Sequence, residues 1–99
     1  MVLTEEDISQ VSTVLSALGN STRLRIVELV SETKRPLHIK AVAEILQKDY
    51  AAVYRHVKVL QKSELLKVYE VGRSRVIYLK NGDLVREIVR IAKKISETE

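Results

Sequence analysis

Apolar residues in the first third of this chain recur at the three- and four-residue spacing of amphipathic helices. Thr4 is followed by three acids, which is typical of a helix N-cap with a negatively charged first turn. One apolar stripe then follows: Ile8, Val11, Leu15 and Leu18. Asn20 to Thr22 offers a second cap, before a wider stripe formed by Leu24, Ile26, Val27 and Val30. The pattern therefore predicts two helices, separated at Gly19, that share a core.

The middle of the chain predicts two further helices joined by a tight connection. After a polar turn at residues 32–36, a third, short helix carries Ala41, Val42, Ile45 and Leu46. Asp49 is the expected N-cap of a fourth helix, from Tyr50 to about Lys62. At about 100° per residue, its apolar side holds Val53, Val57 and Leu60. The opposite side holds Ala51, Tyr54, Arg55, Lys58 and Lys62, so one face should be core and the other cationic.

The last third predicts a hairpin and a final helix. β-Branched and aromatic residues fill segments 65–71 and 75–79, on either side of Gly72, Arg73 and Ser74. The final helix should open at Gly82. It carries two adjoining apolar stripes, Leu84, Ile88, Ile91 and Ile95 on one and Val85, Val89 and Ala92 on the other. Two stripes are more than one small core needs.

Positive charge is concentrated in the middle of the chain. From Lys48 to Lys80 there are eight Lys or Arg residues against three acids, whereas the remainder has nine against ten. A phosphate backbone attracts such a segment because binding releases counterions. Two short helices, a cationic helix and a basic hairpin follow one another in the order of a winged helix-turn-helix. The sequence thus predicts one mainly α domain over residues 1–99, with about five helices and a two-stranded wing, that binds double-stranded DNA.

Composition removes several function classes. With 45% hydrophobic and 30% charged residues the chain is globular, and without cysteine it has no disulfide, thiolate metal site or cysteine nucleophile. No acid–base or nucleophile constellation stands out, so we expect no catalytic residues, no cofactor and no enzyme activity. No apolar run approaches the roughly 18 residues of a spanning helix, and the N-terminus is acidic where a signal peptide would be basic. We therefore expect a cytoplasmic protein that does not bind membranes.

Three motifs resemble the ArsR-type winged-helix repressors of bacteria and archaea, over about residues 14–91. The segment 15–27 looks like the family's opening signature of a helix, a short break and an Arg-Leu-x-Ile helix. The segment 52–60 is similar to its recognition helix, and residues 72–79 look like its wing, where a Gly-Arg turn leads to a Tyr-bearing strand. The resemblance implies a symmetric dimer built from the first and last helices, and transcriptional control through operator binding.

The chain also departs from that pattern. The family often has glycine after the recognition helix, and Ser63-Glu64 stands there instead, so a different helix exit is expected. The cysteine pair of metal-sensing members is missing. The last helix has only Asp83 and Glu87 on one face, where the family's other metal site uses His and acids. Metal sensing is therefore not carried over, and we expect no bound metal.

The candidate DNA contacts lie on the fourth helix and the wing. Arg55 could bind guanine in a bidentate manner, with Tyr54 and Lys58 at base edges, Lys62 on phosphate and Ala51 near a thymine methyl. The full set is Tyr50, Ala51, Tyr54, Arg55, Lys58, Lys62, Arg73 and Arg75. The alternatives are an ordinary solvated helix face and a charged hairpin tip that merely discourages edge pairing. Two other functions stay open: an architectural or non-specific DNA-binding protein, and a module that docks an acidic protein.

The terminal segments, 1–18 and 82–96, are the candidate dimerisation helices. The predicted interface consists of Ile8, Val11, Leu15, Leu84, Ile88, Ile91 and Ile95. These stripes could instead pack within one chain. A membrane-surface helix is a rival for segment 82–96 because it also carries four cations, but it lacks a large aromatic anchor.

The histidines and tyrosines have simpler interpretations than ligand binding. His38 and His56 are far apart in sequence, and neither has a cluster of metal ligands nearby. We expect His38 to cap or flank the third helix and His56 to make a structural hydrogen bond. For Tyr50, Tyr69 and Tyr78, packing with the hydroxyl at the surface is favoured over base stacking.

Overall fold

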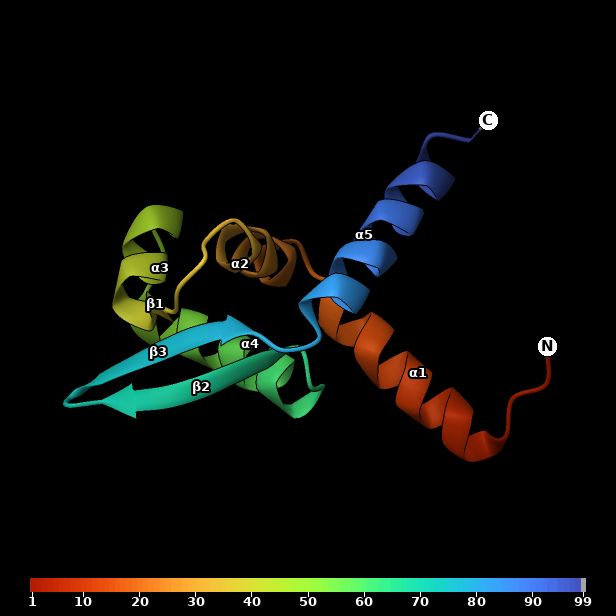
Figure 1. The fold of residues 1–99 in the computed structure, drawn as a ribbon, viewed down its shortest axis with the longest axis horizontal. Helices are drawn as coiled ribbons and strands as arrows, with labels where there is room; N and C mark the ends of the chain where they lie inside the picture. The colour runs from red at the N-terminus through yellow and green to blue at the C-terminus, as the bar shows by residue number, and fades with distance from the viewer. Residues whose placement is uncertain (99) are drawn as a thin grey trace.

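The computed structural model describes residues 1–98. Its elements, in chain order, are α1 (Glu5–Leu18), α2 (Ser21–Ser31), β1 (Leu37–His38), α3 (Ile39–Leu46), α4 (Tyr50–Lys62), β2 (Leu66–Val71), β3 (Ser74–Leu79) and α5 (Gly82–Ser96). Figure 1 shows α2, α3, α4 and the sheet gathered in one body, from which α1 and α5 project on the side of the two termini. The winged helix-turn-helix predicted from the sequence is confirmed. Within the described part of the chain, no helix combines the length and apolar character needed to cross a bilayer.

The core is built around the apolar side of α4. Val53, Val57 and Leu60 are each 0% exposed, as the helical spacing predicts. They belong to one cluster with buried residues of α2, α3 and β3, among them Ile26, Val27, Ile39, Val42 and Ile77. Full burial of each such side chain stabilises the fold by about 1.5 to 3 kcal/mol. The orientation of α4 is therefore fixed by its inner face, which leaves the outer face available.

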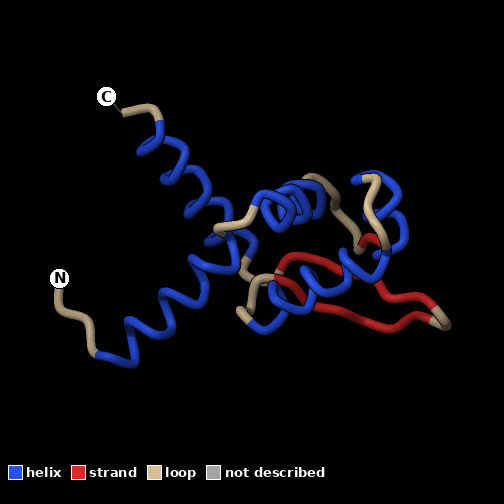
Figure 2. Tube along the Cα trace, turned by 180° about the vertical axis from the view of Figure 1, so that it is seen from behind, coloured by secondary structure: helices blue, strands red, loops and turns tan. Residues whose placement is uncertain are grey.

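The sheet has three strands in the order β1-β3-β2, all antiparallel. The sequence pattern predicts only two strands, since β1 is two residues long and too short to show a period. The hairpin turn is also tighter than predicted. Val71 pairs with Ser74, so Gly72 and Arg73 alone make the turn, and Gly72 has a φ of 61° that a residue without a side chain adopts easily. Figure 2 shows this hairpin pointing away from both chain ends.

The helix starts match the predicted caps in part. Thr4 and Asp7 form a capping box at α1, and Asn20 accepts a hydrogen bond from the Arg23 N–H at α2. Asp49 precedes α4 with extended backbone angles but makes no side-chain cap hydrogen bond. Asp49 is nevertheless the N-cap residue of α4, as predicted, and its negative charge lies at the positive end of the helix dipole. His38 likewise flanks α3 without capping it through its side chain.

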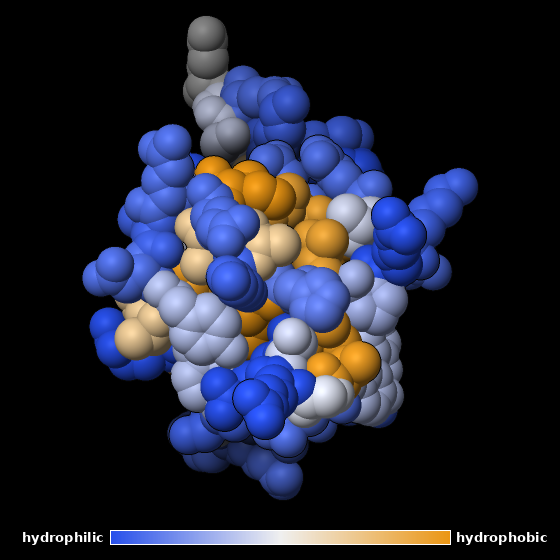
Figure 3. Space-filling model, turned by 90° about the vertical axis from the view of Figure 1, so that its left-hand side faces the viewer, coloured by the Kyte–Doolittle hydropathy of each residue, from blue (hydrophilic) through white to orange (hydrophobic). Residues whose placement is uncertain are grey.

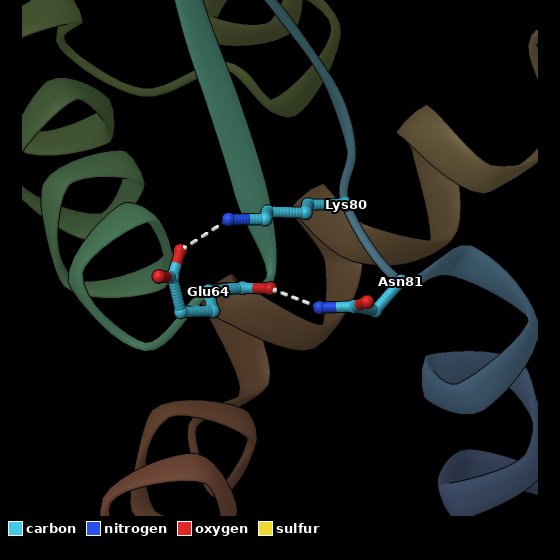
Figure 4. A network of polar contacts seen from close by, with 3 residues as sticks. All are labelled: Glu64, Lys80 and Asn81. Carbon is cyan, nitrogen blue, oxygen red and sulfur yellow. Dashed lines mark hydrogen bonds and ion pairs between the residues drawn. The ribbon is translucent and has the colours of Figure 1, made fainter.

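The exit from α4 keeps a left-handed residue although glycine is absent. Glu64 has a φ of 65°, a conformation that costs a residue with a Cβ more than it costs glycine. Figure 4 shows two contacts around it: Lys80 Nζ donates to Glu64 Oε2 at 2.8 Å, and Asn81 Nδ2 donates to the Glu64 carbonyl at 3.1 Å. The Leu65 N–H donates to the Leu60 carbonyl at 3.0 Å and closes the helix end. The Glu64 side chain thus adds a contact with Lys80, two residues before α5, that a glycine at this position would lack.

Candidate nucleic-acid interface

The outer face of α4 is cationic. Ala51, Arg55 and Lys62 are exposed, and Lys58 is half-buried. Within residues 1–98, no carboxylate oxygen lies within 4.0 Å of the Arg55, Lys58 or Lys62 nitrogens. This face therefore offers cations that form no ion pair with the acids of the part of the chain that the structure describes. Figure 3 views the α3 and wing-tip end and shows hydrophilic side chains surrounding a smaller apolar area.

One apolar position at this end differs from expectation. Ile45 is one of the four apolar residues predicted for the third helix, but it is 58% exposed on α3. Val42 and Ala43 carry the inner side instead, together with Ile39 at the helix start. Ile39, Val42, Ala43 and the half-buried Leu46 follow the three- and four-residue spacing of one helix face, and this spacing leaves Ile45 on the other side.

Three of the predicted DNA contacts, Tyr50, Tyr54 and Arg75, belong to a cluster between the wing and α4. The Tyr50 and Tyr54 rings are stacked with centroids 6.3 Å apart. From β3, the Arg75 guanidinium carbon lies 4.5 Å from the Tyr54 ring centroid, and Arg75 Nη1 donates to the Tyr50 hydroxyl at 3.4 Å. Arg75 Nε lies 3.9 Å from Glu70 Oε1. The hydrogen bond to Tyr50, followed by the electrostatic influence of Tyr54 and Glu70, raises the pKa of Arg75.

The wing tip carries a single cation that the body of the protein does not engage. Arg73 is exposed, as are Gly72 and Ser74 on either side. In the part of the chain that the structure describes, Arg73 takes part in no ion pair or side-chain hydrogen bond. The two arginines that the sequence groups together thus have different surroundings, because Arg75 points back to α4 and Arg73 sits at the tip.

His56 makes the structural hydrogen bond expected from the sequence. Its Nδ1 lies 3.1 Å from Nη1 of Arg23, so the neutral imidazole accepts from the guanidinium. The same guanidinium donates to the Ala17 carbonyl at 2.7 Å and to the Ser16 carbonyl at 3.3 Å. Burial, then the neighbouring charges of Arg23, Arg55 and Lys48, lowers the pKa of His56 below 6.5. Arg23 is not among the predicted site residues, although it opens the Arg-Leu-x-Ile motif in the sequence.

The other titratable groups do not gather into a metal site. Among residues 1–98, no three His, Cys, Asp or Glu side chains lie close enough together to hold an ion.

Tyr69 and Tyr78 stack with centroids 5.3 Å apart on the outer face of the wing, and their hydroxyls are 2.7 Å apart. That hydrogen bond raises the pKa of Tyr78.

The helices α1 and α5 leave a second, apolar surface uncovered. Figures 1 and 2 both show them diverging from the body. A cleft of about 530 Å³ lies between them, lined by Leu15, Leu18, Leu24, Ile88, Val89 and Ala92 among others. The predicted interface residues are mostly exposed: Ile8 47%, Val11 45%, Leu15 52%, Leu84 65%, Ile91 45% and Ile95 69%. Ile88 alone among them is half-buried.

Known proteins resemble this chain in sequence and in fold. An uncharacterized HTH-type transcriptional regulator of Methanocaldococcus jannaschii, MJ1325, is 26% identical over 90 residues, which are 91% of this chain and 99% of that protein. NolR from Sinorhizobium fredii superposes with a TM-score of 0.78 at 20% identity, covering 100% of this chain and 99% of its own.

A possible ArsR-family regulator of Mycobacterium bovis, described as a homodimeric winged helix-turn-helix DNA-binding domain, has a TM-score of 0.78 at 20% identity. The match covers 91% of this chain and 82% of that one. The sequence profile of the HVO_A0114 family matches residues 19–86, which include α2, α3, α4 and the wing. The chain therefore belongs to the HVO_A0114 family, and its fold is that of the ArsR-type winged helix-turn-helix regulators.

Proposed function

We propose that this protein is a transcription regulator that binds a specific sequence of double-stranded DNA as a homodimer. The observation that carries the proposal is the outer face of α4, where Arg55, Lys58 and Lys62 form no ion pair with any acid among residues 1–98. This face lies on the second helix of the helix-turn-helix, which in such folds enters the major groove. The relatives that are named as transcription regulators support the same function.

Each part of the surface has a task in this proposal. Arg55 binds a base edge, Lys58 and Lys62 bind phosphates or base edges, and Ala51 leaves room for the groove wall. Arg73 at the wing tip binds the backbone beside the groove. Tyr50 is exposed beside this surface, and Tyr54 is half-buried. Regulation of this kind takes place where the DNA is, and we therefore place the protein in the cytoplasm.

The dimer follows from the second surface. A 99-residue chain buries a modest fraction of its surface, so it gains much from a partner. The exposed apolar residues of α1 and α5 would meet the same residues of a second copy around a twofold axis. The Mycobacterium bovis relative is described as homodimeric, which supports this arrangement. A twofold dimer presents two α4 helices, so the preferred DNA site should be an imperfect palindrome with half-sites roughly 34 to 36 Å apart.

Selection of bound sequences from a random duplex pool tests the proposal. We expect one palindromic sequence to be enriched and to be bound about 10³-fold or more tightly than random duplex at fixed salt. Uniform binding of all duplexes would support the architectural alternative instead. An absence of binding to any duplex at low salt would contradict DNA binding altogether and would favour a module that docks an acidic protein.

A further inference from the structure

We propose that Arg75 is a positioning residue that ties the wing to α4 through Tyr50 and Tyr54, and that it does not itself bind DNA phosphate. The inference rests on the proposed function and deepens it, because it assigns the two wing arginines different tasks. In this assignment Arg73 contacts the backbone, and Arg75 sets where Arg73 lies relative to Arg55.

The strand register directs Arg75 to α4. Side chains alternate along β3, so Arg75 shares a face with Ile77, which is 0% exposed in the core around α4. Its partner across the ladder is Glu70 on β2. The Arg75 side chain therefore leaves the wing on the side of the protein body.

The guanidinium uses three different parts for three contacts. Nη1 donates to the Tyr50 hydroxyl, the face of the group lies over the Tyr54 ring at 4.5 Å, and Nε is directed to Glu70 at 3.9 Å. A planar fork can meet an aromatic face and an in-plane acceptor at the same time, whereas a lysine ammonium is a point charge that can satisfy one of them. The cluster is thus specific for arginine.

Arg75 is also the last such contact before the tip. Residues 69–74 are all exposed, so the outer part of the hairpin is held by strand pairing and by the Arg75 cluster. A two-stranded ribbon by itself is a weakly stable element. Without the cluster, the distance between Arg73 and the outer face of α4 would vary, and a DNA site that needs both contacts would be bound more weakly.

The salt dependence of binding separates the two roles. Each phosphate contact contributes close to one unit to the slope of log affinity against log salt. We expect Arg73→Gln to lower the magnitude of that slope by about one unit. We expect Arg75→Gln to weaken binding by about three- to tenfold with the slope unchanged, and Arg75→Lys to weaken binding to a similar extent although it keeps the charge. A lower slope for Arg75→Gln, with wild-type affinity for Arg75→Lys, would show that Arg75 binds phosphate and would overturn the proposal.

A double variant tests the route through Tyr50. If Arg75 acts through the tyrosine hydroxyl, Arg75→Gln combined with Tyr50→Phe should bind no more weakly than Arg75→Gln alone. If the two residues act independently, the fold-losses in affinity of the two single variants would multiply in the double variant. That result would show that Arg75 does not act through Tyr50.

Hydrogen exchange of the DNA-free protein keeps the inference separate from the proposed function. We expect the amides of residues 69–76 to exchange faster in Arg75→Lys than in the wild type, while those of the α4 core stay protected. Since lysine keeps the charge and the aliphatic stem, this variant should fold. Unchanged exchange at the wing would contradict the tether even if DNA binding is demonstrated, and faster exchange would support it even if the wild type binds no duplex.

Discussion

The helices α4 and α5 have similar amphipathic sequences but different partners. They are 13 and 15 residues long, and each carries an apolar stripe beside a charged face. In α4, Val53, Val57 and Leu60 are fully buried, whereas in α5 only Val85 is buried. The periodicity indicates that an apolar face will be covered. It does not indicate whether the cover comes from the same chain.

The charged faces of the two helices differ in the opposite way. On α5, Arg86 contacts Asp83, Arg90 contacts Glu87 and Lys93 lies 3.9 Å from Glu97. Three of the four cations of α5 therefore have an acidic partner nearby, which disfavours the rival interpretation of α5 as a helix that binds an anionic membrane surface. On α4, the outer cations form no ion pair with any acid among residues 1–98, so α4 is the better candidate for binding an anionic partner.

The largest expected effect is at the apolar face of α5. Ile91→Glu should split the dimer or unfold it, because it leaves an unpaired charge in the seam between two copies. Ile45→Glu is the matched control, since Ile45 is 58% exposed on α3, away from that seam, and it should remain a dimer. Sedimentation at micromolar concentration measures both. A monomeric wild type, or an Ile91→Glu variant that still sediments as a folded dimer, would contradict this seam.

The next effect concerns the cationic face of α4. Arg55→Ala should weaken binding to the selected DNA site by roughly 1 to 3 kcal/mol and relax the sequence preference, because a bidentate base contact is lost. Lys58→Ala should weaken binding with less change in preference. Lys94→Ala removes an exposed cation from α5 and should bind like the wild type. Wild-type affinity and selectivity in Arg55→Ala would show that α4 is not the recognition helix.

The sequence predicts the helices better than it predicts the joints between them. The bounds of α4 and its inner face can be predicted from the sequence, because its three buried side chains recur at the helical spacing. The strand β1 is too short to show a period, and its two residues are fixed by pairing with Ile77 and Val76 of β3. The role of Arg75 was also beyond the pattern, since its contact with Tyr54 joins residues 21 positions apart through the tertiary fold.

A smaller effect is expected from His56, which connects α4 to the end of α1 through Arg23. The folded state lowers the pKa of His56, so the unfolded chain binds this proton more readily. Its contribution to stability is complete above about pH 6.5 and is lost as the pH falls from there towards the lower folded pKa. Urea unfolding at about pH 8 and about pH 5.5 should show a loss in the wild type that is smaller in His56→Gln. Equal losses in the two proteins would assign the pH dependence to other groups.

The smallest effect is expected at Glu64, which lies at the exit from α4 and contacts Lys80. Glu64→Gly and Glu64→Ala both remove the ion pair with Lys80, and both keep the carbonyl that Asn81 contacts. They differ in the backbone, because alanine retains the cost of the 65° φ and glycine does not. We therefore expect Glu64→Gly to melt a few degrees above Glu64→Ala, and to lie close to the wild type, since the lost pair is exposed and such pairs stabilise little. Thermal unfolding followed by circular dichroism measures the difference, and a Glu64→Gly variant that melts below Glu64→Ala would show that the left-handed conformation imposes no cost at this joint.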